Sequence, residues 1–555
     1  MTSTGATIVY DALEEAGIDL LIGLPGTQTI PLDRIVAERD EMRYVMARHE
    51  TAIPHVAWGY YESGGGIAAT LTVPGPGETN AMHGLKNALD DCVPLIHISA
   101  DVNPEDRGYG PIHEIESNTY DNVVKENINV PDKESLADAL RDGISAARRP
   151  PTGPVRLGIP STLLRAEIPS AGRTDSEADS HSETGAVPGR ALEILAEAQR
   201  PVLYVGGGAR RSPAGSETVA ALADVLNCPV ISSYKGKGVF PEDDSRFVGV
   251  TAGHLPAGGK RVLEEADVVL ALGTDFDGVT TGHWELPMGD RLLHVTLEPD
   301  APTAYDVDVT IAGDVSAVGT AILEQLNRPD TESWNGEHIG QAVRSEYFDH
   351  LRDLGLLDPH DAPAHLPAVY DRLRATLPRE AIISTDIGGH RLWAKQTFEA
   401  YDRNRYITAG SWAGMGVGLP SAIGAKLAHP DKPVVTLTGD GSLMMCIHEL
   451  HTAAEHDVNV VVVVLNDADY GIISDQPEIA DVAEGRRFSW TSPDFAMIAE
   501  GFGCHGTRVD TAVDAAEAVE NALQSKRGPE LIDVVIDYDD PSVFEAAEYD
   551  STVPF

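Results

Sequence analysis

The sequence is poor in basic residues: 41 lysines and arginines stand against 87 aspartates and glutamates, a formal net charge of −46 in 555 residues. Such a negative surface repels nucleic acids and anionic membranes, so neither is expected as a partner. The acidic residues are spread along the whole chain rather than gathered in one acidic tail. An evenly acidic surface with few lysines is typical of a protein adapted to high salt.

Cysteines and long apolar runs are also scarce. The four cysteines are widely spaced, with no CxxC pair and no metal-binding spacing, so we expect buried thiols in a reducing cytosol. No run approaches 18 uninterrupted apolar residues, which predicts that no segment spans a membrane. Met1-Thr2-Ser3 leads into a helix-like segment without the basic and apolar regions of a signal peptide. These features predict a cytoplasmic protein.

Helical and strand patterns alternate along the chain, which is typical of α/β domains with parallel sheets. The length allows three domains, each with its own core, and polar segments rich in small residues divide the chain. We therefore predict three doubly wound parallel-sheet domains. Their predicted boundaries are 1–168 for the first domain, 169–190 for a linker, 191–328 for a central domain, 329–364 for a connecting segment, 365–540 for the third domain and 541–555 for a tail.

The most informative segment runs from Thr436 to Gly471. It reads as a strand ending in GDG, a helix, and a very apolar strand that stops at Asn466-Asp467. Because parallel strands joined by a helix bring their carboxyl ends side by side, Asp440 and Asp467 are predicted to meet beside a helix N-terminus. Hard oxygen ligands next to free N–H groups suit a magnesium ion that holds a diphosphate.

Taken alone, GDG is more often a simple turn and ND a simple strand end. Two features favour the metal site: the long apolar run VVVVVLND and a spacing between the two acids that fits one crossover connection. The segment resembles the diphosphate and metal motif of thiamine-diphosphate enzymes, with Asp467 in place of the usual second asparagine. Aspartate is an equally good hard-oxygen ligand, and its extra charge favours tight binding of Mg²⁺ or admits Ca²⁺.

The resemblance covers nearly the whole chain. The phrases GLPG, RHE and VPGPGETNAMHGLKNALDDCVPLIHI, in that order, are similar to the pyrimidine-binding domain of the acetolactate synthase group. RPVLYVGGGARR is similar to its central domain, and TDIGGHRLWA and SWAGMGVGLPSAIGAK to its diphosphate-binding domain. The resemblance therefore implies the three-domain thiamine-diphosphate-binding fold, with a pyrimidine, a central and a pyrophosphate domain.

The resemblance also implies roles for individual residues. Glu50 becomes the glutamate that protonates the aminopyrimidine ring, which calls for a buried carboxyl with a raised pKa. By local pattern alone, a glutamate in the first helical turn is more often a partner of the helix dipole. The other residues implied to contact thiamine diphosphate are Pro25, Gly26, Asn80, Gly388, Gly389, His390, Ala413, Met415, Gly439, Gly441 and Ser442. The implied Mg²⁺ ligands are Asp440, Asp467 and the carbonyl of Asp469.

Met415 matches the bulky residue that props the cofactor in its V shape, which holds the reacting groups close together. The alternative is a core methionine, but a methionine among four glycines has little core to join.

The substrate region departs from the amino-acid-pathway acetolactate synthases. Asp275 and Val279 stand where those enzymes usually carry arginines for the second oxo acid, and Gln476 stands where they carry a tryptophan. His113 replaces a glutamine; a lone histidine is more often structural, but this one would face the reacting carbon, which favours a polar or acid–base role. The segment 251–259 lacks the usual flavin motif, so FAD is doubtful.

The resulting hypothesis is a carboligase that decarboxylates a 2-oxo acid and joins the remainder to a second carbonyl, acetolactate-synthase-like with altered acceptor specificity. Glu50, His113 and Gln476 are its candidate catalytic residues. A non-oxidative 2-oxo acid decarboxylase or an acyl-CoA lyase is the alternative within the same class. A catalytically silent paralogue is the third reading, which the intact Glu50, Asp440, Asp467 and Met415 disfavour.

The resemblance also has consequences for assembly. In the family the glutamate and the metal site come from neighbouring subunits, which implies a homodimer or homotetramer with active sites between subunits. A small regulatory subunit is compatible with the resemblance, but nothing in the sequence reports one.

Overall fold

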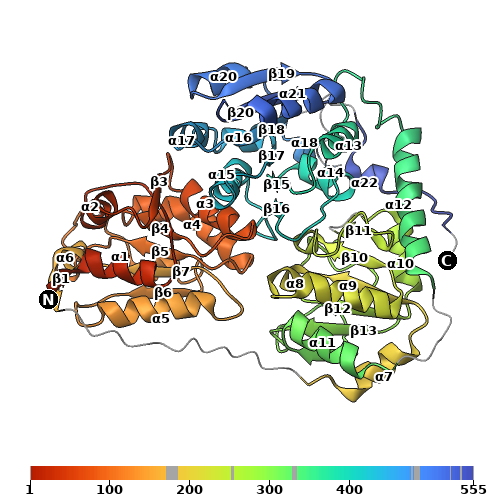
Figure 1. Cartoon of the computed structure of the whole chain (residues 1–555), viewed down its shortest axis with the longest axis horizontal. Helices are drawn as coiled ribbons and strands as arrows, with labels where there is room; N and C mark the ends of the chain where they lie inside the picture. The colour runs from red at the N-terminus through yellow and green to blue at the C-terminus, as the bar shows by residue number, and fades with distance from the viewer. Residues whose placement is uncertain are drawn as a thin grey trace.

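Three six-stranded sheets, each flanked by helices, make up the chain (Figure 1). The computed structural model describes residues 2–169, 186–251, 255–327, 334–474, 476, 479, 488–525, 527–537 and 540–553. Neighbouring strands in all three sheets run parallel, and the strand orders cross over, as doubly wound folds require. The predicted fold class is confirmed.

The N-terminal sheet has the order β3-β2-β4-β5-β7-β6. Its strands are β2 (Leu20–Gly23), β3 (Arg43–Met46), β4 (Ala69–Thr72), β5 (Ile96–Ser99), β6 (Glu126–Asn129) and β7 (Val155–Gly158). Its helices are α1 (Gly5–Glu15), α2 (Ile30–Glu38), α3 (Ala52–Glu62), α4 (Pro76–Asp90), α5 (Leu136–Arg148) and α6 (Ser161–Arg165), with short 3-10 turns at Pro104–Asp106 and Ser117–Tyr120. A small antiparallel pair, β1 (Thr2–Thr4) with β8 (Glu167–Pro169), brings the two ends of this domain together.

The central sheet has the order β11-β10-β9-β12-β13-β14. Its strands are β9 (Pro201–Val205), β10 (Val230–Ser233), β11 (Phe247–Thr251), β12 (Val268–Leu272), β13 (Leu292–Thr296) and β14 (Val309–Ala312). The helices around it are α7 (Gly189–Glu197), α8 (Gly207–Arg211), α9 (Gly215–Leu226), α10 (Ala257–Glu265) and α11 (Val315–Gln325), with a 3-10 turn at Tyr234–Gly236.

The C-terminal sheet has the order β16-β15-β17-β18-β20-β19. Its strands are β15 (Ile382–Thr385), β16 (Tyr406–Thr408), β17 (Val434–Gly439), β18 (Val461–Asn466), β19 (His505–Val509) and β20 (Glu530–Val535). Its helices are α13 (Leu366–Thr376), α14 (Gly389–Thr397), α15 (Gly418–Ala428), α16 (Asp440–Met444), α17 (Glu449–Glu455), α18 (Gly471–Ser474), α20 (Phe495–Gly501), α21 (Ala512–Ser525) and α22 (Val543–Ala546).

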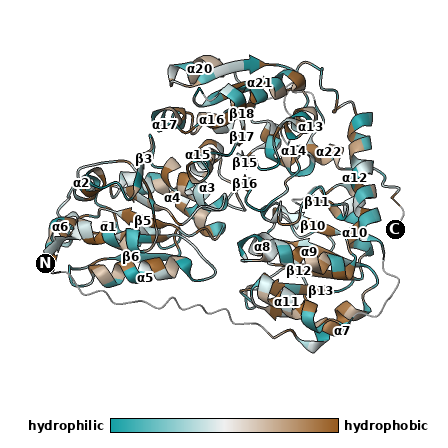
Figure 2. Ribbon diagram, in the orientation of Figure 1, coloured by the Kyte–Doolittle hydropathy of each residue, from teal (hydrophilic) through white to brown (hydrophobic). Residues whose placement is uncertain are grey.

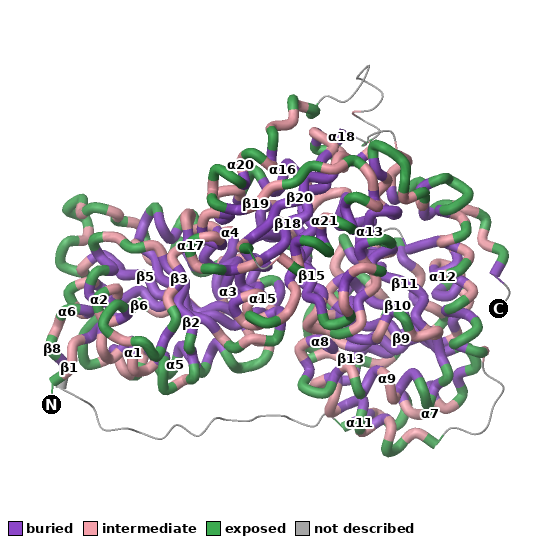
Figure 3. Tube along the Cα trace, turned by 45° about the horizontal axis from the view of Figure 1, so that its top comes forward, coloured by how far each residue is buried: buried purple, intermediate pink, exposed green. Residues whose placement is uncertain are grey.

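Apolar strands explain where the cores lie. Every residue of β18, VVVVLN, is buried, because helices cover both faces of a parallel sheet. Figure 3 shows buried residues along the strands and exposed residues on the outer turns. In contrast, α12 (Gly336–Asp353) has hydrophilic residues along much of its length (Figure 2) and packs on the central domain near β11. The predicted connecting segment therefore contains an 18-residue helix.

Two glycines let the outer domains approach each other closely. Helices α3 and α15 form the main contact between the N-terminal and C-terminal domains. A Cβ on Gly59 would lie 2.2 Å from the carbonyl oxygen of Ser421, and a Cβ on Gly424 would lie 2.0 Å from that of Val56. A larger residue at either position would force the two helices apart.

A buried ionic cluster joins all three domains. Glu62, at the end of α3, accepts contacts from Arg210 at 3.1 Å, from Arg211 and from Lys235 at 3.5 Å. Asp91 lies 3.1 Å from the same Lys235 and also accepts the indole N–H of Trp58 and the backbone N–H of Gly410. The three central-domain cations therefore each have a carboxylate partner from the N-terminal domain.

Smaller expectations differ from the structure in detail. One helix was expected between β17 and β18, but the segment forms two, α16 and α17. The irregular tail contains one helical turn, α22, with a capping box formed by Ser542 and Glu545. The four cysteines form no disulfide; Cys92 is half-buried and the other three are buried. Among the described residues, no helix is both long and apolar enough to cross a membrane.

Candidate active site

Two acidic side chains lie where neighbouring strands of the C-terminal sheet end. Strands β17 and β18 are paired so that Gly439 lies opposite Leu465; Asp440 follows directly after β17, and Asp467 directly after Asn466, the last residue of β18. Asp440 is the first residue of α16, so its carboxylate lies at a helix N-terminus. The parallel pairing of the two strands thus brings the acids together, as the spacing in the sequence predicts.

Asp440 is a buried acid with an incompletely satisfied carboxylate. Its side chain is buried, and its Oδ2 has no hydrogen-bond partner among the described residues. Burial, followed by repulsion from Asp467, raises the pKa of Asp440 to about 7. Asp469, two residues beyond Asp467, likewise has a buried Oδ2 without a partner. A divalent cation would neutralise the two facing carboxylates, so this group of acids fits Mg²⁺.

The Gly388–His390 segment, at the N-terminus of α14, lies against the same edge. A Cβ on Gly388 would be 2.8 Å from Nδ1 of His390, and a Cβ on Gly439 would be 3.1 Å from the same atom. The imidazole therefore packs between the two glycine-containing segments. Burial and the neighbouring Arg391 lower the pKa of His390 to about 3, so the ring is neutral, and its buried Nε2 has no partner among the described residues. Gly389, at the start of α14, has open space where a Cβ would stand.

Asp386 holds the loop that carries Met415. This fully buried acid accepts backbone N–H groups from Gly416 at 2.9 Å and from Gly418 at 2.8 Å, besides that of its neighbour Ile387. Sequence reasoning missed Asp386, although its place directly after β15 was a usable signal. Ala413 and Gly416 take positive φ angles of 48° and 86°, so the loop turns sharply on both sides of Met415.

On the other side of this edge, aromatic side chains cover Gly441. A Cβ there would lie 2.7 Å from the ring of Tyr470 and 3.3 Å from that of Trp490, and the two rings meet edge to face at 5.0 Å. Ser442 donates its hydroxyl to the carbonyl of Ile387 at 2.7 Å, which ties α16 to the loop after β15. These aromatics were not predicted, because their distance along the chain hides the contact.

Glu50 and Asn80 meet at the carboxyl edge of the N-terminal sheet. The amide of Asn80, from α4, donates to Oε2 of Glu50 at 3.1 Å. A Cβ on Gly77 would stand 3.5 Å from Oε1 of Glu50, so glycine leaves room beside the carboxylate. The predicted role of Glu50 requires a fully buried carboxyl. In the single chain, however, Glu50 is only half-buried.

Pro25, Gly26 and His113 belong to the same edge. A Cβ on Gly26 would collide with the side chain of Val73 at 2.3 Å, and a Cβ on Gly75 would lie 2.7 Å from the carbonyl oxygen of His113. Pro25 is exposed beside Gly26. His113 itself has a φ of 68°, and its buried Nδ1 has no partner among the described residues. The structure thus brings His113 to the VPGPGE turn, next to the Glu50 group.

Three protein-family models match successive parts of the chain, one for each of its three domains. The family model "Thiamine pyrophosphate enzyme, N-terminal TPP binding domain" matches residues 3–123, the central-domain model matches 189–326, and the "C-terminal TPP binding domain" model matches 386–534. The chain belongs to the thiamine pyrophosphate enzymes. The predicted class, a thiamine-diphosphate-dependent enzyme that forms or cleaves carbon–carbon bonds, is confirmed.

Individual relatives of this thiamine pyrophosphate enzyme cover nearly its whole length. It is 29% identical to "Acetolactate synthase large subunit" of Haemophilus influenzae over 550 residues, which cover 96% of this chain and 94% of that protein. It is 29% identical to "Acetolactate synthase isozyme 3 large subunit" of Escherichia coli, covering 96% and 95%. It is 28% identical to "Probable acetolactate synthase large subunit" of Methanocaldococcus jannaschii, covering 96% and 92%.

Within one chain of this enzyme, the N-terminal and C-terminal domains contact each other near the predicted site residues, but not through Glu50 and the metal-binding aspartates. His83 of α4 accepts the indole N–H of Trp412 at 2.8 Å and lies 3.3 Å from the carbonyl oxygen of Met415. The buried Glu449 of α17 accepts the backbone N–H groups of Arg48 and His49, both at 3.0 Å. Among the described residues, no hydrogen bond or ion pair joins Glu50 to the metal and diphosphate edge.

Three residues predicted to set the substrate form no hydrogen bond or ion pair with these groups among the described residues. Asp275 and Val279 are exposed in the segment after β12 of the central domain. Gln476 is exposed, and its amide donates to the carbonyl of Ile472 at 3.0 Å. Of the flavin-related segment, residues 252–254 lie outside the described part of the chain.

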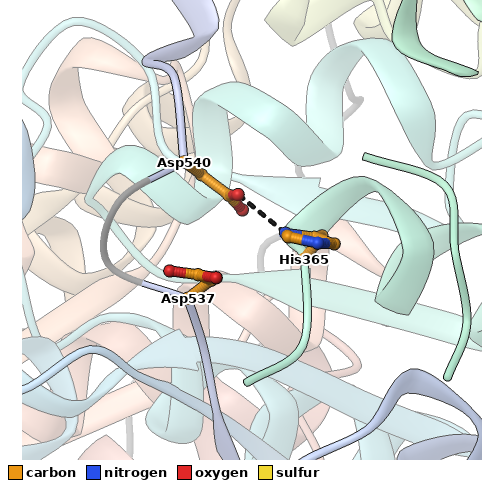
Figure 4. A group of neighbouring side chains, drawn as sticks. All are labelled: His365, Asp537 and Asp540. Carbon is orange, nitrogen blue, oxygen red and sulfur yellow. Dashed lines mark hydrogen bonds and ion pairs between the residues drawn. The ribbon is translucent and has the colours of Figure 1, made fainter. Parts of the chain in front are cut away.

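A second acidic group could be mistaken for a metal site. Ligand atoms of His365, Asp537 and Asp540 lie within 4.8 Å of one another, and Figure 4 shows the imidazole facing Asp540. His365 Nδ1 lies 2.7 Å from Asp540, and Nε2 lies 3.1 Å from Asp361. The hydrogen bond with Asp540 raises the pKa of His365 to about 9, whereas burial raises that of Asp540 against the opposing effect of the histidine. A protonated imidazole has no lone pair with which to bind a metal ion. We therefore interpret this group as ion pairs between His365, which directly precedes α13, and the neighbouring aspartates.

Proposed function

We propose that this enzyme is a carboligase for 2-oxo acids: it releases CO₂ from one 2-oxo acid and joins the remaining acyl unit to the carbonyl of a second. The observation that carries the proposal is the group of Asp440, Asp467, the Gly388–His390 segment and the Met415 loop at one sheet edge, in a chain related along its length to acetolactate synthase large subunits. The reaction needs no external oxidant or reductant, because one carbon–carbon bond breaks and another forms.

Thiamine diphosphate, when bound, supplies the carbon nucleophile and the electron sink for loss of CO₂. Asp440, Asp467 and the carbonyl of Asp469 would hold Mg²⁺ on its diphosphate, while N–H groups of Gly441 and Ser442 would bind phosphate oxygens. Met415 would support the bound cofactor, and Asp386 keeps the Met415 loop in place through its hydrogen bonds to backbone N–H groups.

Glu50 holds a proton at the ring nitrogen of the aminopyrimidine, and Asn80 orients its carboxyl through the hydrogen bond to Oε2. Glu50 is half-buried in one chain, yet this role needs a dry, neutral carboxyl. A second subunit that places its metal edge over Glu50 would remove the remaining water. We therefore propose a homodimer, or a pair of such dimers, with active sites between subunits.

Acceptor choice is proposed to differ from that of the amino-acid-pathway enzymes. Asp275 and Val279 offer no cation for the carboxylate of a second oxo acid, and the exposed Gln476 offers an amide rather than a large ring. His113, whose Nδ1 has no partner among the described residues, is proposed to hold or move a proton at the substrate carbonyl. The acidic composition further supports activity at high salt.

The deciding experiment incubates the protein with Mg²⁺, thiamine diphosphate and high KCl across a panel of 2-oxo acids. A carboligase releases one CO₂ for every two molecules of 2-oxo acid consumed and forms a 2-hydroxy-3-oxo acid. A simple decarboxylase releases one CO₂ per 2-oxo acid with an aldehyde as the second product, and an acyl-CoA lyase turns over only acyl-CoA substrates. Tight cofactor binding without turnover of any substrate would identify a silent paralogue.

A further inference from the structure

Lys395, on α14, is a buried cation without a partner. Its side chain is 1% exposed, and its Nζ has no hydrogen-bond acceptor among the described residues. Removing an ammonium group from water without an acceptor is costly, so such a group needs either a neutral state or a negative charge beside it.

The charged neighbours of Lys395 make its position less favourable. Arg391 lies one turn earlier on the same face of α14, and Lys237 approaches from the central domain. Lys237 donates to the carbonyl of Lys395 at 3.0 Å and to Oε2 of Glu242 at 2.5 Å. Oε2 of Glu242 also accepts the N–H of Ala400, so this oxygen is already engaged, and no hydrogen bond or ion pair joins Glu242 to Lys395 among the described residues. Burial, Arg391 and Lys237 together hold the pKa of Lys395 well below its usual value.

Arg391 is also incompletely satisfied. It is 4% exposed; its Nη1 donates to the carbonyl of Ala409 at 2.9 Å, but its buried Nε has no acceptor among the described residues. The ring of Tyr234, from the central domain, lies 5.1 Å from the guanidinium and 5.9 Å from Nζ of Lys395. At 5.9 Å the ring is at the limit of an effective cation–π contact, so it does little to offset the charge of the lysine.

We propose that Lys395 and Arg391 bind a small anion at the junction between the central and C-terminal domains. The shared chemistry is a compact negative charge that accepts hydrogen bonds from Nζ and Nε, whether a halide or a small oxyanion such as phosphate or acetate. The near-complete burial of both side chains restricts the ligand to a small one.

An anion at this place would act on the cofactor loop through Arg391. The carbonyl that Arg391 holds belongs to Ala409, from which the chain continues directly into the loop carrying Ala413 and Met415. An occupied site would keep the guanidinium in position and so stabilise the start of this loop. The anion would therefore be a structural ligand, separate from the substrate and from the diphosphate of the cofactor.

The first test compares melting temperatures of the holoenzyme, with Mg²⁺ and thiamine diphosphate saturating. Sodium concentration and ionic strength are held constant while chloride, bromide, phosphate or acetate replaces the bulky anion gluconate, because the highly acidic surface responds to cations in any salt. At least one small anion should raise the melting temperature of the wild type by a few degrees. Lys395→Met should abolish this rise, whereas the exposed-lysine control Lys133→Met should keep it.

Equal responses of the wild type and Lys395→Met would overturn the proposal and identify Lys395 as a neutral buried amine. Lys395→Gln serves as a second variant if the methionine side chain disturbs folding. A crystal structure grown in the anion with the largest effect should show it within hydrogen-bond distance of Lys395 Nζ and Arg391 Nε. Absence of such density would also overturn the proposal, whatever the melting temperatures.

Discussion

The two outer domains present sheet edges of the same kind, but these edges hold their polar groups very differently. On the C-terminal domain, Asp386 and Asp440 are almost completely buried, and backbone N–H groups or neighbouring acids surround them. On the N-terminal domain, Glu50 is half-buried and accepts one side-chain hydrogen bond, from an exposed Asn80. The first edge is therefore buried within one chain, whereas the second is open, which is the reason for proposing that a second subunit covers it.

The largest effect is expected from Glu50→Gln, which should lower kcat strongly while leaving cofactor affinity almost unchanged. The amide keeps the shape of the carboxyl but cannot deliver a proton, so kcat should fall by about 1,000-fold, within the range of general acid–base catalysis. Cofactor affinity, measured by calorimetry with Mg²⁺ present, should stay close to that of the wild type. Retained turnover would remove Glu50 from the mechanism.

Mixing two inactive variants tests whether one active site is built from Glu50 of one subunit and Asp440 of the other. Asp440→Ala should bind Mg²⁺ and cofactor too weakly for turnover, and Glu50→Gln should bind but not react. After denaturation and joint refolding in equal amounts, half of the dimers are mixed, and each holds one intact site, so about a quarter of the wild-type activity should return. No recovery, with mixed dimers verified by mass spectrometry, would place both edges of a site in one chain.

A smaller effect is expected from Asp386→Asn, which tests the rigidity of the binding edge. The amide loses the negative charge that accepts N–H groups from Gly416 and Gly418, so the free energy of unfolding should fall by about 2 kcal/mol. Chemical denaturation measures this difference. The cofactor should also bind more weakly, because the Met415 loop is no longer held. As a control, Asp138→Asn, an exposed acid on α5 of the opposite domain that pairs with Arg141, should leave cofactor affinity unchanged.

The smallest expected effect belongs to a group outside both edges, His365→Gln. The pKa of His365 is raised to about 9 in the folded chain, so its ion pairs stabilise the fold fully below the unfolded pKa near 6.5, and this contribution is lost as the pH rises through 9. We expect a loss of about 1 kcal/mol at pH 6 that disappears above pH 9. Denaturation curves across this range measure it. A difference that persists at high pH would contradict the ion-pair interpretation.

Local sequence patterns anticipated much of this molecule. The two apolar strands that flank the GDG motif, Val434–Gly439 and Val461–Asn466, were recognisable, because burial on both faces demands continuous apolar runs. Pairing of such strands then places Asp440 beside Asp467 without further information. Contacts between distant segments left no such signal: Tyr470 and Trp490 over Gly441, His83 against Trp412, and Glu449 at the Arg48 turn.

The sequence by itself determined the fold class and the order of the acids along the chain, since period, length and strand-end residues are local properties, while the cofactor followed from the resemblance of its motifs to thiamine-diphosphate enzymes. Only the tertiary structure decided which polar groups are satisfied. Lys235 and Lys395 are both lysines at one domain junction, yet Lys235 has two carboxylates within 3.5 Å, whereas Nζ of Lys395 has no acceptor among the described residues. The physical reason is that burial and charge compensation depend on side chains brought together from three domains, a property that no short stretch of sequence contains.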